Sequence, residues 1–363
     1  MRSVLLMVSV CSLVLLMTWG CTDDDNPVDS GGEQFDVLYV LNQADQTIYK
    51  YNAETLVRID SIETPVVEPH FIEFSHDRDY YYVVGRQVGG QLAKYRTADD
   101  SLVQLVTVEG SMFPTALVVS PNDDTVYVCD FTNAKGRTHR YAASGASFSF
   151  LDSNLQAGYQ SHDIDLSSDG GLFVSAGFNS DDITVVDLDS GTTTPYRIED
   201  ATPGFGTSPA SYGPYGVNLD LDEQMAILAC RKGVDQLRLI DFINGTVIDS
   251  ILIPTADATQ SAMAGPTLMD ITPDNDRVFV TGFTDNRMWV VQLSTRSVLQ
   301  TIPLGTPRPF TVNVTSDGSR VYVSATNTRP SPGQVYVIDG NSYAVLDSVQ
   351  TGSEPFGVRL LER

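Results

Sequence analysis

The stretch from residue 308 to residue 339 decides the fold, and it reads RPFTVNVTSDGSRVYVSATNTRPSPGQVYVID. A proline precedes an apolar segment, and a Ser-Asp-Gly turn leads into a Val-Tyr-Val segment. After a polar loop, a third segment ends in Ile-Asp. Runs of valine, tyrosine and isoleucine bounded by turn residues are typical of short β-strands. The stretch therefore predicts three consecutive strands joined by turns.

Degraded copies of this stretch recur from about Phe35 to the C-terminus. A period in the forties with several short strands in each repeat is typical of a β-propeller, with one four-stranded blade per repeat. Six repeats are complete. The residues that begin their first strands, together with the last such residue near the C-terminus, lie 43 to 53 positions apart: Pro69, Pro114, Ser161, Pro214, Pro266, Pro309 and Pro355.

The two ends of the chain supply a seventh blade. Segments 37–41, 47–51 and 56–62 match the second, third and fourth strands of a repeat, whereas residues 355–361 match only the first strand. Joining the two fragments in one sheet closes the ring and removes two exposed sheet edges. We therefore expect an all-β, seven-bladed β-propeller of four-stranded antiparallel blades. Its last blade is closed by the C-terminal strand, which pairs with the N-terminal strands.

The first 34 residues differ from the repeats. Arg2 precedes a nearly unbroken apolar run that ends at Met17, and this run is shorter than the ~20 residues that a membrane-spanning helix needs. We predict a signal peptide at residues 1–20, a lipidated Cys21 with an acidic tether at residues 21–34, and the propeller at residues 35–363. Gly20-Cys21 resembles a bacterial lipoprotein signal, which implies a lipid anchor in the cell envelope, at the outer membrane or cell surface. Plain secretion with a free Cys21 is the alternative.

The chain is strongly acidic, with 46 Asp and Glu against 22 Lys and Arg and a formal net charge of −24. Because such a surface repels polyanions, we expect no nucleic-acid partner. Acidity of this kind is compatible with cation binding, with a salty habitat, or simply with solubility. We expect a monomer.

The sequence contains no Walker-type glycine loop and no HExxH, CxxC or GxSxG motif, so no catalytic residue and no cofactor can be assigned from motifs. Cys129 and Cys230 lie two blades apart, beyond the reach of a disulfide. We expect them to be free, buried thiols.

In a propeller the first strand of each blade lines the axis, and the face on which these strands begin collects side chains from every blade. Such a mixed set suits a small anionic or aromatic ligand, unless it only caps the channel. His70 and His162 come from blades that are not adjacent, so we expect no metal site. The candidate ligand-binding residues are His70, His162, Tyr215, Arg308, Glu354, Asp130, Arg231 and Asn42. Segment 198–213 is expected to be either a flap over this face or a mobile surface loop.

Residues 120–129 (SPNDDTVYVC), 272–282 (TPDNDRVFVTG) and 315–324 (TSDGSRVYVS) resemble the YVTN-type β-propeller repeat family. The resemblance extends from about Phe35 to Leu361 and implies an extracytoplasmic propeller. Related propellers include lactonases and amine dehydrogenases. The first hypothesis is an envelope-anchored module that binds a protein, glycan or small ligand at the funnel face. The alternative is a lactonase-like or dehydrogenase-like enzyme that uses His70, His162, Arg308 and Glu354, and a funnel closed by aromatic side chains would argue against it.

Overall fold

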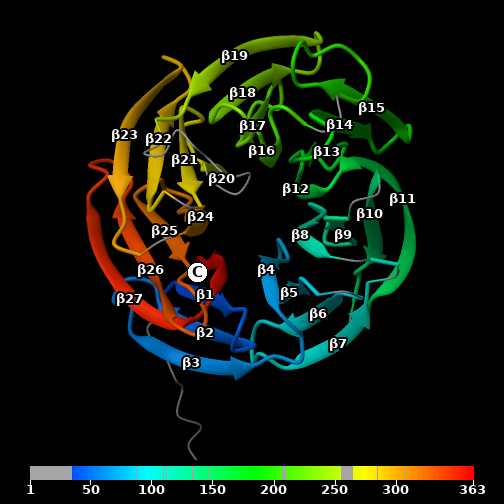
Figure 1. Ribbon diagram of the computed structural model, residues 1–363. Coiled ribbons are helices and arrows are strands. Elements are labelled where there is room, and N and C mark those ends of the chain that lie inside the picture. Colours follow the sequence, from blue (N-terminus) through cyan, green and yellow to red (C-terminus); the bar gives the residue numbers. More distant parts are fainter. Residues whose placement is uncertain are drawn as a thin grey trace, which may run out of the picture. The chain divides into compact units, whose positions relative to one another are not determined.

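The computed structural model describes residues 35–363 except 88, 109, 112, 133–134, 146, 207–209, 255–264, 284 and 307. In this part of the chain, 28 strands form seven four-stranded antiparallel sheets around one axis (Figure 1). No helix among the described residues is long and apolar enough to cross a membrane. The expected seven-bladed propeller is confirmed.

We number the blades in the order of their innermost strands around the ring, beginning with the blade that contains both chain ends. The innermost strands are β28 (Pro355–Leu361), β4 (Pro69–Phe74), β8 (Pro114–Val119), β12 (Ser161–Leu166), β16 (Pro214–Leu219), β20 (Pro266–Ile271) and β24 (Pro309–Val314). The second strands are β1 (Val37–Asn42), β5 (Tyr80–Gly85), β9 (Thr125–Asp130), β13 (Leu172–Gly177), β17 (Ala226–Cys230), β21 (Arg277–Gly282) and β25 (Arg320–Ala325).

The third strands are β2 (Thr47–Asn52), β6 (Gln91–Arg96), β10 (Lys135–Ala142), β14 (Asp182–Asp187), β18 (Gln236–Asp241), β22 (Arg287–Gln292) and β26 (Pro332–Asp339). The outermost strands are β3 (Arg58–Glu63), β7 (Leu102–Thr107), β11 (Ser149–Tyr159), β15 (Thr192–Arg197), β19 (Thr246–Leu252), β23 (Ser297–Pro303) and β27 (Val345–Ser353). At 11 residues, β11 is the longest of the described strands, and its pairing with β10 is interrupted by bulges.

Blade 1 closes the ring. Its strand order is β28-β1-β2-β3, so the last strand of the chain pairs with the first. Leu38 lies opposite Leu360 and Val40 lies opposite Val358 in this antiparallel ladder. These side chains are buried together. The expected closure by the C-terminal strand is therefore confirmed.

Burial decreases from the axis toward the rim. Strand β1 is buried at every position, whereas the outermost strand of the same blade, β3, exposes five of its six residues. The second and third strands of neighbouring blades pack face to face, as in the cluster that contains Val84 of blade 2 and Val128 of blade 3. Apolar burial between blades therefore holds the ring together.

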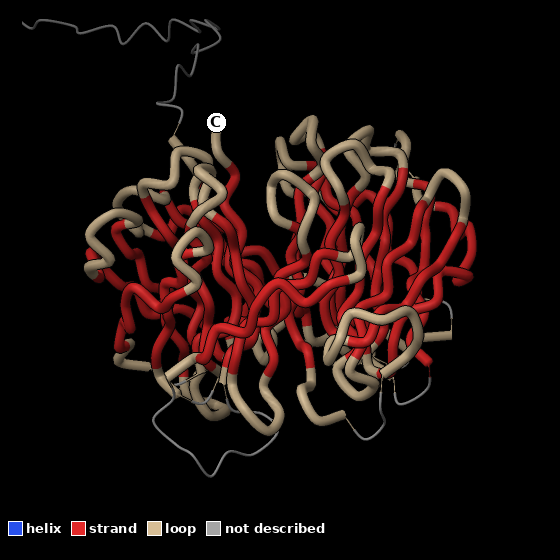
Figure 2. The backbone as a smooth tube through the Cα atoms, turned by 90° about the horizontal axis from the view of Figure 1, so that it is seen from above, coloured by secondary structure: helices blue, strands red, loops and turns tan. Residues whose placement is uncertain are grey.

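The two faces of the disc differ in their loops. We call the face on which the innermost strands begin the N-face, and the face on which they end the C-face. The C-terminus marks the C-face, which is uppermost in Figure 2. On the C-face, a short turn joins each innermost strand to the second strand. In the turn of blade 2, Ser75 Oγ donates to Asp77 and accepts from the Tyr80 N–H.

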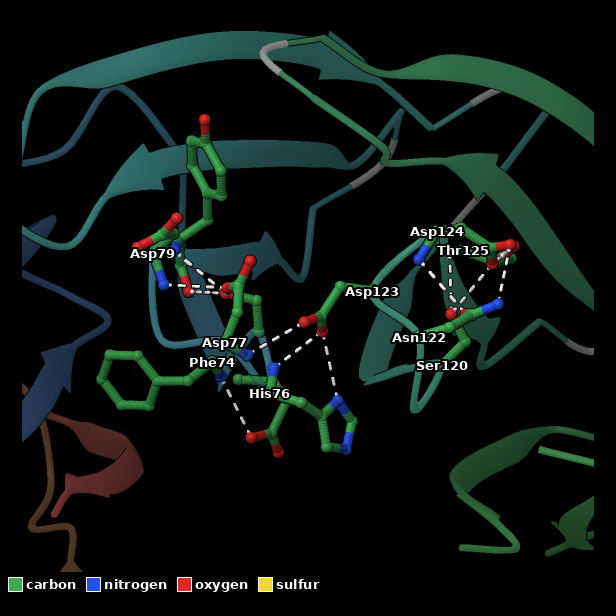
Figure 3. Close-up of polar contacts among 12 residues, drawn as sticks. Phe74, His76, Asp77, Asp79, Ser120, Asn122, Asp123, Asp124 and Thr125 are labelled. Carbon is green, nitrogen blue, oxygen red and sulfur yellow. Dashed lines mark hydrogen bonds and ion pairs between the residues drawn. The ribbon is translucent and has the colours of Figure 1, made fainter. Parts of the chain in front are cut away.

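A side chain in one turn binds the backbone of the turn in the preceding blade. Asp123 of blade 3 accepts the N–H groups of His76 and Asp77 at 2.7 and 2.9 Å (Figure 3). Three other blades repeat this contact with a carboxylate or an amide oxygen, and the pairs are Glu223 with Ser168, Asn275 with Leu221, and Glu362 with Ser316.

At two other blade boundaries the donor and the acceptor of this hydrogen bond are both missing. Pro121 and Pro273 occupy the turn position that would donate, and proline has no N–H. The next blade carries Gly170 or Gly318 where an acceptor would stand. A Cβ on either glycine would lie 3.1 or 3.2 Å from the proline ring. Matched pairs of donor with acceptor or of proline with glycine therefore occur at six of the seven boundaries. At the seventh, between blades 1 and 2, the Arg78 guanidinium donates to the Glu362 carbonyl.

Candidate functional site

Two rings of side chains surround the axis near the N-face. The inner ring is the second residue of each innermost strand, and every member is buried: His70, Thr115, His162, Tyr215, Thr267, Phe310 and Phe356. The outer ring is the residue that follows each second strand, and its members are Gln43, Arg86, Phe131, Phe178, Arg231, Phe283 and Thr326.

Aromatic rings from distant blades fill the axis. The ring centroids of His70 (blade 2) and His162 (blade 4) are 5.9 Å apart. Phe310 of blade 7 lies 5.3 Å from His70 and 5.9 Å from His162. Tyr215 stacks on His162 at 3.6 Å. The two histidines come from blades that are not adjacent, but both side chains reach the axis and meet there.

The two imidazoles contain three buried nitrogen atoms without a hydrogen-bond partner. His70 Nδ1 lies 2.8 Å from Gln43 Oε1, but His70 Nε2 and both nitrogens of His162 have no partner among the described residues. Both side chains are fully buried. A buried polar group left unpaired costs about 1–3 kcal/mol. Such groups are rare in native proteins and often coincide with functional sites.

Positive charge surrounds this cluster. The Arg231 guanidinium lies 3.2 Å from the centroid of the Tyr215 ring, and Arg86 lies 5.7 Å from that of Phe131. Burial lowers the pKa of both histidines well below the ordinary value, and the nearby Arg86 lowers it further. The imidazoles are therefore neutral near pH 7, and they can accept or donate hydrogen bonds but do not contribute charge.

Arg308 and Glu354 remain at the rim of the N-face. Arg308 lies 5.8 Å from the ring centroid of Phe283 and forms no ion pair with a described carboxylate. Glu354 pairs instead with Arg329, which also pairs with Glu68. The structure thus brings four of the eight candidate residues together at the axis, namely His70, His162, Tyr215 and Arg231, and places Arg308 and Glu354 outside that cluster.

Asn42 and Asp130 form polar contacts outside the aromatic cluster. Asn42 bonds Thr47 and Thr351, whereas Asp130 accepts the Phe113 N–H at 2.8 Å. Both residues end a second strand, and side chains alternate along a strand, so an error of one residue selects the wrong side. The following residues, Gln43 and Phe131, occupy the axial positions that the sequence interpretation missed. Counting eight residues from the last residue of the turn, Asp123, would have identified Phe131.

The described part of segment 198–213 is fixed to blade 4. Asp181 accepts the N–H groups of Tyr212 and Gly213 at 2.9 and 2.8 Å and also that of Ser211. Arg197 Nε donates to the Phe205 carbonyl. These bonds do not favour a flap that swings over the axis. Residues 255–264, which make up most of the connection between β19 and β20, lie outside the described residues.

Within the described ranges, no three His, Cys, Asp or Glu side chains are placed to hold a metal ion. His70 and His162 thus have no third ligand of these types. Cys129 and Cys230 are free and buried, as predicted. They do not, however, occupy the same position in their blades, because Cys230 lies opposite Pro214 whereas Asp130 lies opposite Pro114.

Comparison with known proteins supports the same architecture. Residues 91–351 match the family described as lactonase, 7-bladed beta-propeller. No curated protein sequence matches the chain. A functionally unknown protein from Desulfotomaculum acetoxidans DSM 771 is similar in structure, with a TM-score of 0.68, 14% identity, and coverage of 90% of this chain and 99% of the other. Kuenenia stuttgartiensis hydrazine synthase has a TM-score of 0.66, 15% identity and coverage of 83% and 97%. At these identities the two structures are evidence for the fold only.

Proposed function

Because the chain belongs to the seven-bladed β-propeller lactonase family, we propose that it is a member that binds a small organic anion at the N-face. One observation carries this proposal. Arg86 and Arg308 lie against aromatic rings on this face, and neither forms an ion pair with a described carboxylate. Arginine is suited to carboxylates because its planar guanidinium donates two parallel hydrogen bonds. The aromatic rings beneath would contact an apolar or aromatic part of the same ligand.

Binding without catalysis fits the geometry better than hydrolysis does. A general base must come within hydrogen-bond reach of the substrate proton that it removes. His70 and His162 are covered completely, and Glu354 is paired with Arg329. Aromatic side chains also fill the axis near the N-face. A funnel closed in this way argues against a lactonase-like or dehydrogenase-like enzyme.

Lactone hydrolysis is the second candidate function, and the family match over residues 91–351 favours it. In this case the neutral imidazole of His162 would serve as the base after the aromatic cluster opens. We further propose that the repeats are of the YVTN type, and that a lipidated Cys21 anchors the chain to the cell envelope. Residues 1–34 lie outside the described part of the structure.

Thermal shift and calorimetry with a panel of organic anions test the proposal. The panel contains citrate, benzoate, glucuronate and phosphate, and γ- and δ-lactones are assayed in parallel for acid release. We expect at least one organic anion to raise the melting temperature, because a ligand that binds only the folded state stabilises it. The double variant Arg86→Ala/Arg308→Ala loses this shift, whereas the exposed Arg96→Ala retains it. Lactone turnover that disappears in His162→Ala would instead establish the second candidate.

A further inference from the structure

A cavity opens along the axis from the C-face, on the opposite side of the aromatic cluster. Its volume is about 260 Å³, and apolar walls from several innermost strands surround it, including Ile72, Leu117 and Val312. An adjoining cavity of about 350 Å³ shares Glu73, Val118, Asp165 and Arg359 with it and extends to the turns. The axis is therefore filled near the N-face and hollow near the C-face.

Six of the seven side chains at one repeat position line the cavity, and Asn313 is the exception. This position is the fifth residue of each innermost strand, and its occupants are Glu73, Val118, Asp165, Asn218, Asp270, Asn313 and Arg359. Asp163, which is 8% exposed, lies at the third position of its strand and adds a fourth carboxylate. Four carboxylates thus face one guanidinium in a space with apolar walls.

Several hydrogen-bond donors of this ring are used within the protein. Arg359 donates to Glu73 Oε1 through Nε at 2.9 Å, with a second guanidinium nitrogen at 2.8 Å from the same oxygen. Asn313 Nδ2 lies 3.3 Å from Asp270 Oδ2. Backbone N–H groups of neighbouring blades are also used, such as that of Leu219, which donates to Asp165 at 2.8 Å.

Acceptors remain after these bonds are counted. Asn218 Oδ1 is buried and has no hydrogen-bond partner in the part of the chain that the structure describes. Glu73 receives its bonds from Arg359 and Phe74 on Oε1, so Oε2 is left for another donor. A ligand that satisfies these oxygens has to supply N–H or O–H groups and not further acceptors.

The electrostatics of the cavity favour a cation. Its carboxylates outnumber its guanidinium, and low-dielectric walls concentrate the resulting field. Burial raises the pKa of Asp163 to about 7 and that of Asp165 to about 6, and it also raises those of Glu73 and Asp270. A bound cation would stabilise the charged form of these buried carboxylates.

We infer that this cavity binds a small organic cation that carries N–H donors, such as a primary ammonium group. The ammonium group lies among Asn218 Oδ1, Glu73 Oε2 and the Asp163 carboxylate, and it fills the acceptors that the protein leaves open. The site is separate from the proposed anion site, because the two lie on opposite sides of the aromatic cluster.

Isothermal titration calorimetry on the purified protein at pH 8 and fixed ionic strength tests the inference with four probes: putrescine, butylamine, tetramethylammonium and Mg²⁺. We expect saturable binding of an amine and no binding of tetramethylammonium, which has charge but no N–H group. Asn218→Leu should weaken amine binding about tenfold or more, the factor that corresponds to one hydrogen bond with a charged group. Asn218 forms no hydrogen bond through Oδ1, so this change removes no internal bond at that atom.

Two further variants keep the result interpretable. Gln300→Leu makes the same type of change on the exposed strand β23 and should leave the affinity unaltered. Asn218→Asp preserves the shape of the side chain and adds a carboxylate, so it should strengthen amine binding. The inference is wrong if no amine binds, if tetramethylammonium binds equally well, if only Mg²⁺ binds, or if both Asn218 variants bind amines as the native protein does. Loss of anion binding in the Arg86→Ala/Arg308→Ala variant has no bearing on this outcome.

Discussion

Removal of strand β28 tests the closure of the ring. A chain that ends at Ser353 loses the β1–β28 ladder and four buried apolar side chains, namely Phe356, Val358, Leu360 and Leu361. Burial of one such side chain stabilises the folded state by about 1.5–3 kcal/mol, so the four together contribute about 6–12 kcal/mol. Domains of this kind have unfolding free energies of about 5–15 kcal/mol. We therefore expect the shortened chain to be unfolded or barely folded at 25 °C.

Circular dichroism and urea titration measure this effect. A single substitution in β28 tests the same closure with a smaller change in stability. Leu360→Ala should lower the unfolding free energy by about 2–5 kcal/mol. Leu346→Ala is the matched control, because Leu346 is 52% exposed on the outer strand β27, and exposed substitutions usually change stability by less than about 0.5 kcal/mol. A synthetic peptide of residues 354–363 should partly restore the shortened chain. The reasoning is refuted if the shortened chain melts like the native one, or if the two leucine variants are equally stable.

Three other predictions concern single side chains. Asp123→Ala should reduce the unfolding free energy by about 2 kcal/mol, because the neighbouring turn loses two hydrogen bonds to a charged acceptor. Asp123→Asn should cost less in the same urea titrations, because Asn275 accepts the equivalent hydrogen bond in blade 6. Equal losses in the two variants would contradict the proposed contact. Asp181→Ala should speed chymotryptic cleavage within segment 198–213, which contains Phe205 and Tyr212 but no Lys or Arg, because three loop N–H groups lose their acceptor; an unchanged cleavage rate would show that the loop is held in another way. His162 has a lowered pKa in the folded state, so the unfolded state binds more protons below pH 6.5 and the unfolding free energy falls as the pH falls. His162→Phe should reduce this loss of unfolding free energy between pH 6.5 and pH 5 by up to about 2 kcal/mol. An undiminished loss would show that other groups cause it.

The repeat pattern predicted the fold because each blade has the same local requirements. Proline before most innermost strands, Ser/Thr-x-Asp turns in several blades and two apolar strands in each repeat are all visible in the sequence, and six complete repeats make the pattern reliable. The closing strand was visible for the same reason, since residues 355–361 match one strand of a repeat whose other strands begin the chain.

The site was predicted only in part because it depends on single-residue register and on side-chain reach. The sequence placed His70 and His162 at the right repeat position, but it did not show that both extend to the axis and touch. Asn42 and Asp130 were chosen one residue too early. The C-face cavity was missed because the fifth residue of each innermost strand carries a different side chain from blade to blade. Its seven members become a ring only when the blades are arranged around the axis.

Polar side chains at the fifth position of the innermost strands also hydrogen-bond backbone groups on the unpaired edges of these strands. Each such strand pairs on one side only, so its other edge presents backbone N–H groups toward the axis. Asp165, Asp270 and Asn313 accept these groups from Leu219, Val314 and Leu360 of the next blade. Part of the acidity at the axis is therefore structural, and only the acceptors left over are available to a ligand.

The central claim is that two histidines from non-adjacent blades meet, buried and uncharged, on the axis of a closed ring. Histidine-selective NMR from pH 8 to pH 5, combined with mass-spectrometric mapping of diethyl pyrocarbonate adducts, tests it most directly. We expect the imidazole signals of His70 and His162 to remain those of neutral rings and neither residue to be modified, while His76, with 54% of its side chain exposed, acquires the adduct. Protonation of His70 and His162 above pH 6, or modification as fast as that of His76, would contradict the account.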